Sequence, residues 1–179
     1  MSRGENLGYV VALITPAIVT ALSLLVTDAG GLHPLGPIPP DAAQAISDEC
    51  LLHPFYRFPW VPGDLACAGL YVLHSFRESG WDLHAKGDYT DALGRPCTPP
   101  GFGECRPHAF GPFQVWRRAP LTWAEACQVF TQLLQRASVC DEPLEMLAAG
   151  KCGTVDGARI SRVRTGGALG ILYQWWMTP

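Results

Sequence analysis

The sequence predicts a mainly α-helical fold, preceded by one apolar segment that is long enough to cross a membrane. Three observations support this prediction. Apolar residues recur at helical spacing in stretches bounded by capping residues and glycine, and no stretch shows a strong strand pattern. An uncharged, mostly apolar run occupies Leu7–Val26. The 179 residues are 48% hydrophobic and 16% charged, which suffices for one core and excludes wholesale disorder.

The N-terminal run decides how the chain is divided. A helix over Leu7–Val26 would be long enough to span a bilayer, with a kink at Pro16. The residues after it offer a poor cleavage site, so an uncleaved anchor is favoured over a signal peptide, and a buried core helix is the third reading. We therefore expect an anchor or signal segment at 1–27, a Pro/Gly-rich linker at 28–40 and a folded domain at 41–179.

The helices of the folded domain follow in order. Asp41 caps a short helix that ends near His53, and Asp64 caps a longer one that Gly80 ends. Residues 81–120 are rich in glycine and proline and form a long ordered excursion without a core helix. Thr122 then opens a helix that continues toward position 140, with Glu125 completing a capping box.

Two further helices are expected beyond position 140. The first covers residues 141–150 and ends at a glycine, and the second covers about 158–175. The segment 151–179 has a local net charge of +3, for which a solvated helix face is the default interpretation.

The seven cysteines all follow the apolar run, which favours an oxidising location outside the cytoplasm. Short separations make Cys97 with Cys105, and Cys140 with Cys152, candidates for local disulfides. Three more cysteines leave one further pair and one free thiol, with the pairing open. They are Cys50, Cys67 and Cys127. A zinc site from Cys97, Cys105 and His108 is the weaker alternative, because its spacing is irregular and a fourth ligand is missing.

Partners and cofactors are constrained by charge and spacing. The formal charge is −3, from 13 basic and 16 acidic residues, so no nucleic-acid partner is expected. No regular metal signature is present, and we expect neither a metal nor another cofactor.

Glu78 is the residue with the most chemical promise. It stands at the C-terminal end of a mostly apolar helix, where the helix dipole and apolar neighbours disfavour a negative charge. A general acid that works near neutral pH needs such surroundings. A glutamate at a helix end is, however, more often a solvated cap or a salt-bridge partner when it is considered alone.

The order of the motifs around Glu78 adds to this interpretation. The run FRESGWDLHAKGD, followed by GRP and by AFGPFQV, resembles the lytic transglycosylases of the lysozyme-like superfamily. Their Glu-Ser pair at a helix end matches Glu78-Ser79, and their Gly-x-x-Gln motif matches Gly111–Gln114. The resemblance spans about residues 41–179 and implies a lysozyme-like helical domain with a long cleft loop.

The resemblance also implies an activity on peptidoglycan glycan strands. Glu78 would act alone as acid and base to give 1,6-anhydro-MurNAc ends. Ser79 would orient the glutamate, Gly111 and Gln114 would hold the sugar, and Trp81 and Phe113 would offer flat faces to sugar rings. A hydrolytic variant would need a second carboxylate, for which three residues are candidates. They are Asp82, Asp88 and Asp91.

One position departs from the family pattern. The usual Tyr-Asn-Ala-Gly is represented by Leu147–Gly150, so the tyrosine expected near the acid or the sugar is missing. A non-catalytic glycan-binding or scaffold module of an envelope complex, and a phage muramidase, therefore remain alternative functions. We expect the protein to act in the periplasm or cell-wall space, anchored in the inner membrane by its first helix.

Overall fold

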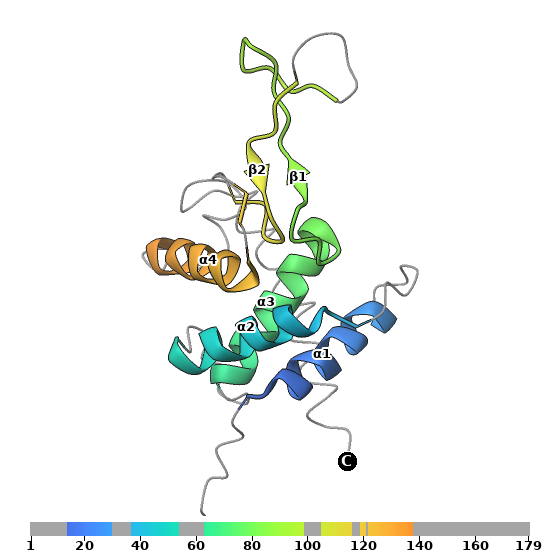
Figure 1. Ribbon diagram of the computed structural model, residues 1–179, viewed down its shortest axis with the longest axis vertical. Helices are drawn as coiled ribbons and strands as arrows, with labels where there is room; N and C mark the ends of the chain where they lie inside the picture. The colour runs from blue at the N-terminus through green and yellow to red at the C-terminus, as the bar shows by residue number, and fades with distance from the viewer. Residues whose placement is uncertain are drawn as a thin grey trace, which may run out of the picture.

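A computed structural model describes residues 14–29, 37–53, 63–98, 105–115, 119–120 and 122–137. Within these residues the fold is mainly helical, with four α-helices and one two-stranded sheet (Figure 1). Three helices, α1, α2 and α3, pack together, α4 lies against α2 and contacts α3 through aromatic rings, and a hairpin extends away from this helical body. The predicted mainly α class is confirmed at this level.

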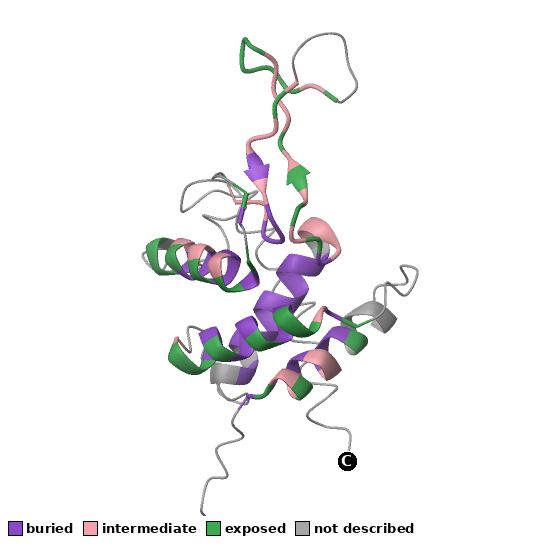
Figure 2. Ribbon diagram, in the orientation of Figure 1, coloured by how far each residue is buried: buried purple, intermediate pink, exposed green. Residues whose placement is uncertain are grey.

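Helix α3, Gly63–Ser79, is the centre of the fold. Residues 67–76 are all buried, so the helix is covered on every side rather than along one stripe (Figure 2). Tyr71 and Val72 are fully buried in its middle. A disulfide between Cys50 and Cys67 joins this helix to α2, Pro40–Leu52. The helix that carries Glu78 is therefore held by packing and by a covalent bond.

Helix α1, Pro16–Ala29, differs from the expected membrane helix. It begins at Pro16 instead of being kinked there, because proline lacks the N–H that an interior position needs and fits the first turn. Val19 and Leu22 are buried at 0% and 1% exposure. None of the helices in the described residues combines the length and the apolar character that a membrane span needs. The helix expected over Leu7–Val26 thus begins at Pro16 in the described residues, and the part of that run before Ile14 lies outside them.

Polar contacts fasten α1 to the rest of the helical body. The Ser23 hydroxyl accepts a hydrogen bond from the Ile38 N–H at 3.0 Å. Ser47 on α2 donates its hydroxyl proton to the Ile14 carbonyl at 3.2 Å. Ile38 is itself 2% exposed, although it falls in the segment expected to be a linker. The described residues before position 41 therefore join the same core as those after it.

Helix α4, Trp123–Ala137, starts where the capping signal predicts. The Thr122 side-chain oxygen accepts a hydrogen bond from the Glu125 N–H at 3.1 Å, which satisfies one of the unpaired N–H groups at the helix start. Ala126, Phe130 and Leu134 are buried at helical spacing and face the other helices. The predicted helix start is observed.

The expected excursion is a hairpin, which we call the arm and define as residues 86–98 and 105–110. Its root is the antiparallel pair β1, Lys86–Gly87, and β2, Ala109–Phe110, with Gly87 opposite Ala109. Thr90 and Arg106 continue the ladder with two backbone hydrogen bonds of 3.0 and 2.9 Å. Apart from Ala109 in β2, the described residues of the arm are exposed or half-buried (Figure 2).

The described residues contain two disulfides and one free cysteine. Cys97 and Cys105 form the predicted disulfide, which closes the arm and removes both thiols from the alternative zinc site. Cys50 pairs with Cys67, and Cys127 is the free, buried thiol, as the count of one pair and one thiol requires. The candidate pair Cys140 and Cys152 lies outside the described residues.

Other predictions also fall outside the described residues. They concern the helices at 141–150 and 158–175, and the Leu147–Gly150 segment.

Candidate active site

Glu78 lies in the last turn of α3 and is half-buried. The helix ends where the sequence predicts, because Gly80 adopts a left-handed conformation with φ 63°. The Gly80 N–H donates to the Phe76 carbonyl at 2.8 Å, which closes the last turn. The backbone that carries Glu78 is thereby fixed to the end of a rigid, buried helix.

Ser79 ties the helix end to the residues that follow. Its hydroxyl donates to the Ser75 carbonyl at 2.9 Å and accepts from the Asp82 N–H at 3.2 Å. These contacts hold the turn after Glu78 in one conformation. Ser79 therefore orients the backbone beside the glutamate.

Backbone hydrogen bonds then connect this turn to the root of the arm. The Ala85 N–H donates to the Asp82 carbonyl at 3.3 Å, and the Ala85 carbonyl accepts from the Gly111 N–H at 2.9 Å. Three consecutive hydrogen bonds, Ser79 to Asp82, Asp82 to Ala85 and Ala85 to Gly111, thus lead from the end of α3 to the first residue of the Gly111–Gln114 motif. The structure brings the two predicted motifs together, although more than thirty positions separate them along the chain.

Gln114 forms two hydrogen bonds within its own motif. Its backbone N–H and its Nε2 both donate to the Gly111 carbonyl, at 3.1 and 2.9 Å. Its Oε1 lies against Gly87 on β1, at the position that a β-carbon there would occupy. The side-chain amide is therefore held at the root of the arm in a defined orientation.

The backbone conformation and the close packing at position 111 both require a glycine. It has φ +75°, and a β-carbon would come within 2.6 Å of the Pro120 ring. The space beside Gly111 is thus filled by the Pro120 ring, although the resemblance implies that Gly111 helps to hold a sugar. A substitution at this position would strain both the backbone and the packing.

Three non-glycine residues with positive φ surround these motifs. They are Trp81, Asp88 and Gln114, with φ of 66°, 48° and 49°. Such conformations are uncommon outside glycine and persist only where the surrounding structure determines them. Gln114 belongs to the Gly111–Gln114 motif, and Trp81 lies two residues after Ser79. Backbone strain of this kind clusters at functional sites.

The aromatic residues behave differently from the prediction. Trp81 and Phe113 are 5% and 2% exposed, so neither presents a flat face to a ligand. The Trp81 Nε1 donates to the Val72 carbonyl at 3.2 Å, and the Phe113 ring stacks on Phe130 with centroids 4.3 Å apart. Both rings are core residues that anchor the site. The burial of their large apolar surface stabilises the fold.

Two of the three candidate second carboxylates, Asp82 and Asp91, hold turns through hydrogen bonds to nearby N–H groups. Asp82 Oδ1 accepts from the His84 N–H at 2.8 Å. Asp91 accepts from the Leu93 and Arg95 N–H groups at 2.8 and 2.9 Å and forms an ion pair with the Arg95 guanidinium at 2.7 Å. The hydrogen bonds from Arg95, backbone first, lower the pKa of Asp91 below its ordinary value. Asp91 therefore organises the tip of the arm as a carboxylate.

Sequence reasoning missed a cluster of rings behind the site. His74, Phe113 and Phe130 are nearly parallel, and Tyr71 meets both phenylalanines edge-on at interplanar angles of 78° and 81°. Only the position of His74, one helical turn before Glu78, pointed to this arrangement in the sequence. The partners come from the motif and from α4, which a linear pattern does not connect.

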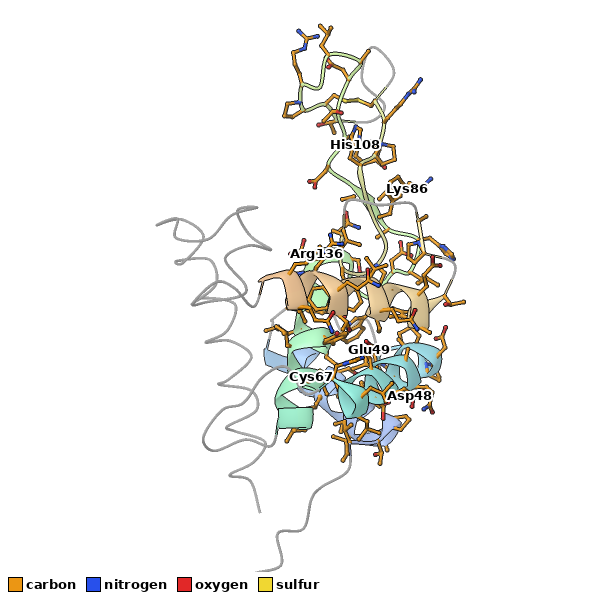
Figure 3. The ribbon with its side chains drawn as sticks, turned by 90° about the vertical axis from the view of Figure 1, so that its left-hand side faces the viewer. Asp48, Glu49, Cys67, Lys86, His108 and Arg136 are labelled. Carbon is orange, nitrogen blue, oxygen red and sulfur yellow. A yellow bond between two sulfur atoms is a disulfide. The ribbon has the colours of Figure 1, made fainter. Side chains whose placement is uncertain are left out.

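A buried polar chain also joins three helices. The Tyr71 hydroxyl hydrogen-bonds the Thr131 hydroxyl, which donates to Glu49 Oε1, both at 2.5 Å. Glu49 lies among the helices while the neighbouring Asp48 points outward (Figure 3). Burial raises the pKa of Tyr71 and that of the nearby Cys127 thiol, so both groups stay protonated at neutral pH.

A separate apolar hollow of about 140 Å³ lies between the motif and α4. Its walls include Phe110, Val115 and Val129. Glu78 and Gln114 are absent from its lining, so it does not coincide with the candidate site. Within the described residues, no group of three or more histidine, cysteine or acidic side chains is arranged to hold a metal ion.

Comparison with known proteins adds no assignment. No family model matches the chain, and neither the curated proteins nor the solved structures contain a match.

Proposed function

We propose that this protein cleaves peptidoglycan glycan strands as a lytic transglycosylase, with Glu78 as its acid and base. The observation that carries the proposal is the hydrogen-bonded path from the end of α3 to the Gly111–Gln114 motif. It places an ionisable carboxyl and an oriented amide on one rigid frame, which is what positioning a sugar for bond cleavage requires.

The chemistry needs only one carboxyl. Glu78 in its protonated form donates to the glycosidic oxygen that leaves MurNAc. The resulting carboxylate then accepts the proton of the C6 hydroxyl of the same sugar while the C6 oxygen attacks C1. This attack closes the 1,6-anhydro ring, and the proton transfer restores the acid. Because the nucleophile is part of the substrate, no second carboxylate is required, in contrast to the usual glycoside hydrolysis.

Gln114 would hold the substrate through its side-chain oxygen. Its Nε2 already donates to the Gly111 carbonyl, which leaves Oε1 as the atom that receives an acetamido N–H. Gly87 leaves the space in which that oxygen lies. The role of the motif in this proposal is therefore orientation of the sugar.

The location follows from the cysteines. The disulfides Cys50–Cys67 and Cys97–Cys105 are typical of proteins in an oxidising compartment. We place the activity outside the cytoplasm, where peptidoglycan lies.

The test uses the full chain with its disulfides formed. Purified sacculi are incubated with wild type, Glu78→Gln and Asp48→Asn, and the masses of the released muropeptides are measured by mass spectrometry. Asp48→Asn is the control, because it alters an exposed carboxyl on α2. The proposal expects products one water lighter than hydrolytic ones from wild type and Asp48→Asn, and none from Glu78→Gln. Products that contain the extra water would instead support a muramidase, and Asp82→Asn would then test for a second carboxyl.

A non-catalytic binding module is the second candidate, favoured by Leu147 where the family has a tyrosine. It expects folded wild type to sediment with sacculi and to release no products, with Glu78→Gln sedimenting equally well.

A further inference from the structure

His74 is a buried titratable group for which the proposed reaction has no role so far. It lies on α3 with 7% exposure, in an otherwise mostly apolar core. An imidazole is the side chain whose charge changes most readily between pH 5 and 8. Because His74 is buried beside the candidate site, a charge on its imidazole would act on the groups of that site.

The ring is fixed by aromatic partners from two other parts of the chain. It is stacked on Phe130 of α4 with centroids 4.8 Å apart and an interplanar angle of 19°. It is also nearly parallel to Phe113, at 6.3 Å and 17°. Phe113 directly precedes Gln114, so His74 contacts the segment that presents the oriented amide.

Helix geometry places the same imidazole on the side of Glu78. The two residues are four positions apart on α3, and such residues share a face with β-carbons about 5–6 Å apart. His74 thus lies one helical turn before Glu78 and in ring contact with Phe113 of the Gly111–Gln114 motif. Among the described residues, this position combines contact with the motif and proximity to Glu78.

Three other titratable side chains belong to the same buried cluster, and two of them stay neutral. Tyr71 on α3 and Cys127 on α4 have pKa values raised by burial and stay neutral. Glu49 on α2 is hydrogen-bonded to Thr131 on the far side of Tyr71. A charge on His74 is therefore the change inside this cluster that acts most directly on Glu78.

We propose that His74 is a positioning residue whose neutral imidazole keeps Glu78 competent as an acid, and whose protonation suppresses the reaction. An imidazolium one turn away stabilises the carboxylate form of Glu78, whereas the first chemical step needs the protonated form. This inference rests on the proposed function and adds a pH-dependent control to it. His74 touches no substrate in this arrangement and acts through Glu78.

The test compares two substitutions in the full chain. His74→Phe keeps an aromatic ring in the stack and removes the charge, and His53→Gln removes an imidazole that is 43% exposed at the C-terminal cap of α2. The kcat/KM for muropeptide release is measured from pH 4.5 to 8. Relative to its own maximum, His74→Phe should retain at least about threefold more activity than wild type at pH 5, while His53→Gln follows wild type.

A second measurement does not depend on activity. The His74 imidazole is titrated by NMR in wild type and in Glu78→Gln, because an interaction between two sites must act equally in both directions. Loss of the carboxylate should lower the His74 midpoint by about half a pH unit or more.

Each outcome separates the two proposals. Coincident acid limbs in wild type and folded His74→Phe, or an unchanged His74 midpoint in Glu78→Gln, overturn the role of His74 and leave the proposed function standing. A shifted midpoint in a protein that releases no products supports the coupling and overturns the proposed function.

Discussion

Gln114 Oε1 occupies the position that a side chain on Gly87 would need. The two residues are 27 positions apart, and the pairing of β1 with β2 brings them together. Gly87 has an ordinary φ, so its importance lies in the space beside it rather than in its backbone conformation. This contact links the arm to the motif that we propose holds the sugar.

Gly87→Ala should therefore damage function more than stability. The new methyl group displaces the flexible Gln114 amide and breaks its hydrogen bond to the Gly111 carbonyl, at a cost of about 1 kcal/mol in the free energy of unfolding. Muropeptide release should fall about tenfold, since orientation of the sugar is lost. Urea unfolding and product release measure the two effects.

Gly94→Ala is the matched control for this prediction. Gly94 has φ +75° at the tip of the arm and nothing within 4 Å of the added carbon. The substitution strains the backbone and should lower stability by about 1 kcal/mol without changing product release. If Gly87→Ala leaves activity at the wild-type level, the role assigned to the Gln114 amide is wrong.

Thr131→Val should be strongly destabilising. The substitution removes the hydroxyl between Tyr71 and Glu49 and leaves a buried carboxyl and a buried phenol without that partner. We expect a loss of about 2–4 kcal/mol in the free energy of unfolding, because unsatisfied buried polar groups retain their full desolvation cost. Thr131→Ser keeps the hydroxyl and should lose about half as much or less. Equal losses in chemical denaturation would show that packing, not the hydrogen bonds, holds α4 here.

Leu22→Ala tests whether α1 is part of the core. Leu22 is 1% exposed against the other helices, and its truncation should cost about 2–5 kcal/mol. Leu24 on the same helix is 45% exposed, and Leu24→Ala should change stability by about 0.5 kcal/mol or less. Thermal unfolding of both variants measures the difference. Similar melting temperatures for the two would contradict the packing of α1.

Alkaline pH should destabilise the protein through Cys127. Burial raises the pKa of its thiol in the folded state, so above the ordinary thiol pKa of about 8.5 the unfolded chain releases a proton that the folded chain retains. The stabilisation is complete below that pH and is lost as the pH rises. Between pH 9 and 10, the free energy of unfolding should fall more steeply in wild type than in Cys127→Ala, by about 1.4 kcal/mol per pH unit. Parallel pH profiles would exclude this contribution.

Several features follow from local signals in the sequence. Thr122 and Gly80 mark a helix start and a helix end because capping satisfies backbone groups within a few residues. The Cys97–Cys105 disulfide follows from a short separation, which makes loop closure easy. Glu78 at a helix end and the Gly111–Gln114 motif are likewise visible in the linear order of residues.

Other features depend on contacts between distant segments. The middle of α3 is buried on every side, because α1 and α2 pack against it and the rings of Phe113 and Phe130 contact it from the motif and from α4. The apolar run before Val26 has the composition of a membrane helix, and α1 instead begins at Pro16 and buries Leu22 against its neighbours. Apolar surface has the same sequence signature whichever apolar environment receives it.

The sequence by itself determined the end of α3, the start of α4, the short-range disulfide and the choice of the candidate acid. Only the tertiary structure decided that Phe113 and Trp81 are core residues, that Cys50 pairs with Cys67, and that His74 stacks behind Glu78. The first set depends on hydrogen bonds and spacing within a few residues. The second depends on which surfaces meet when the helices pack, and that is a property of the whole chain.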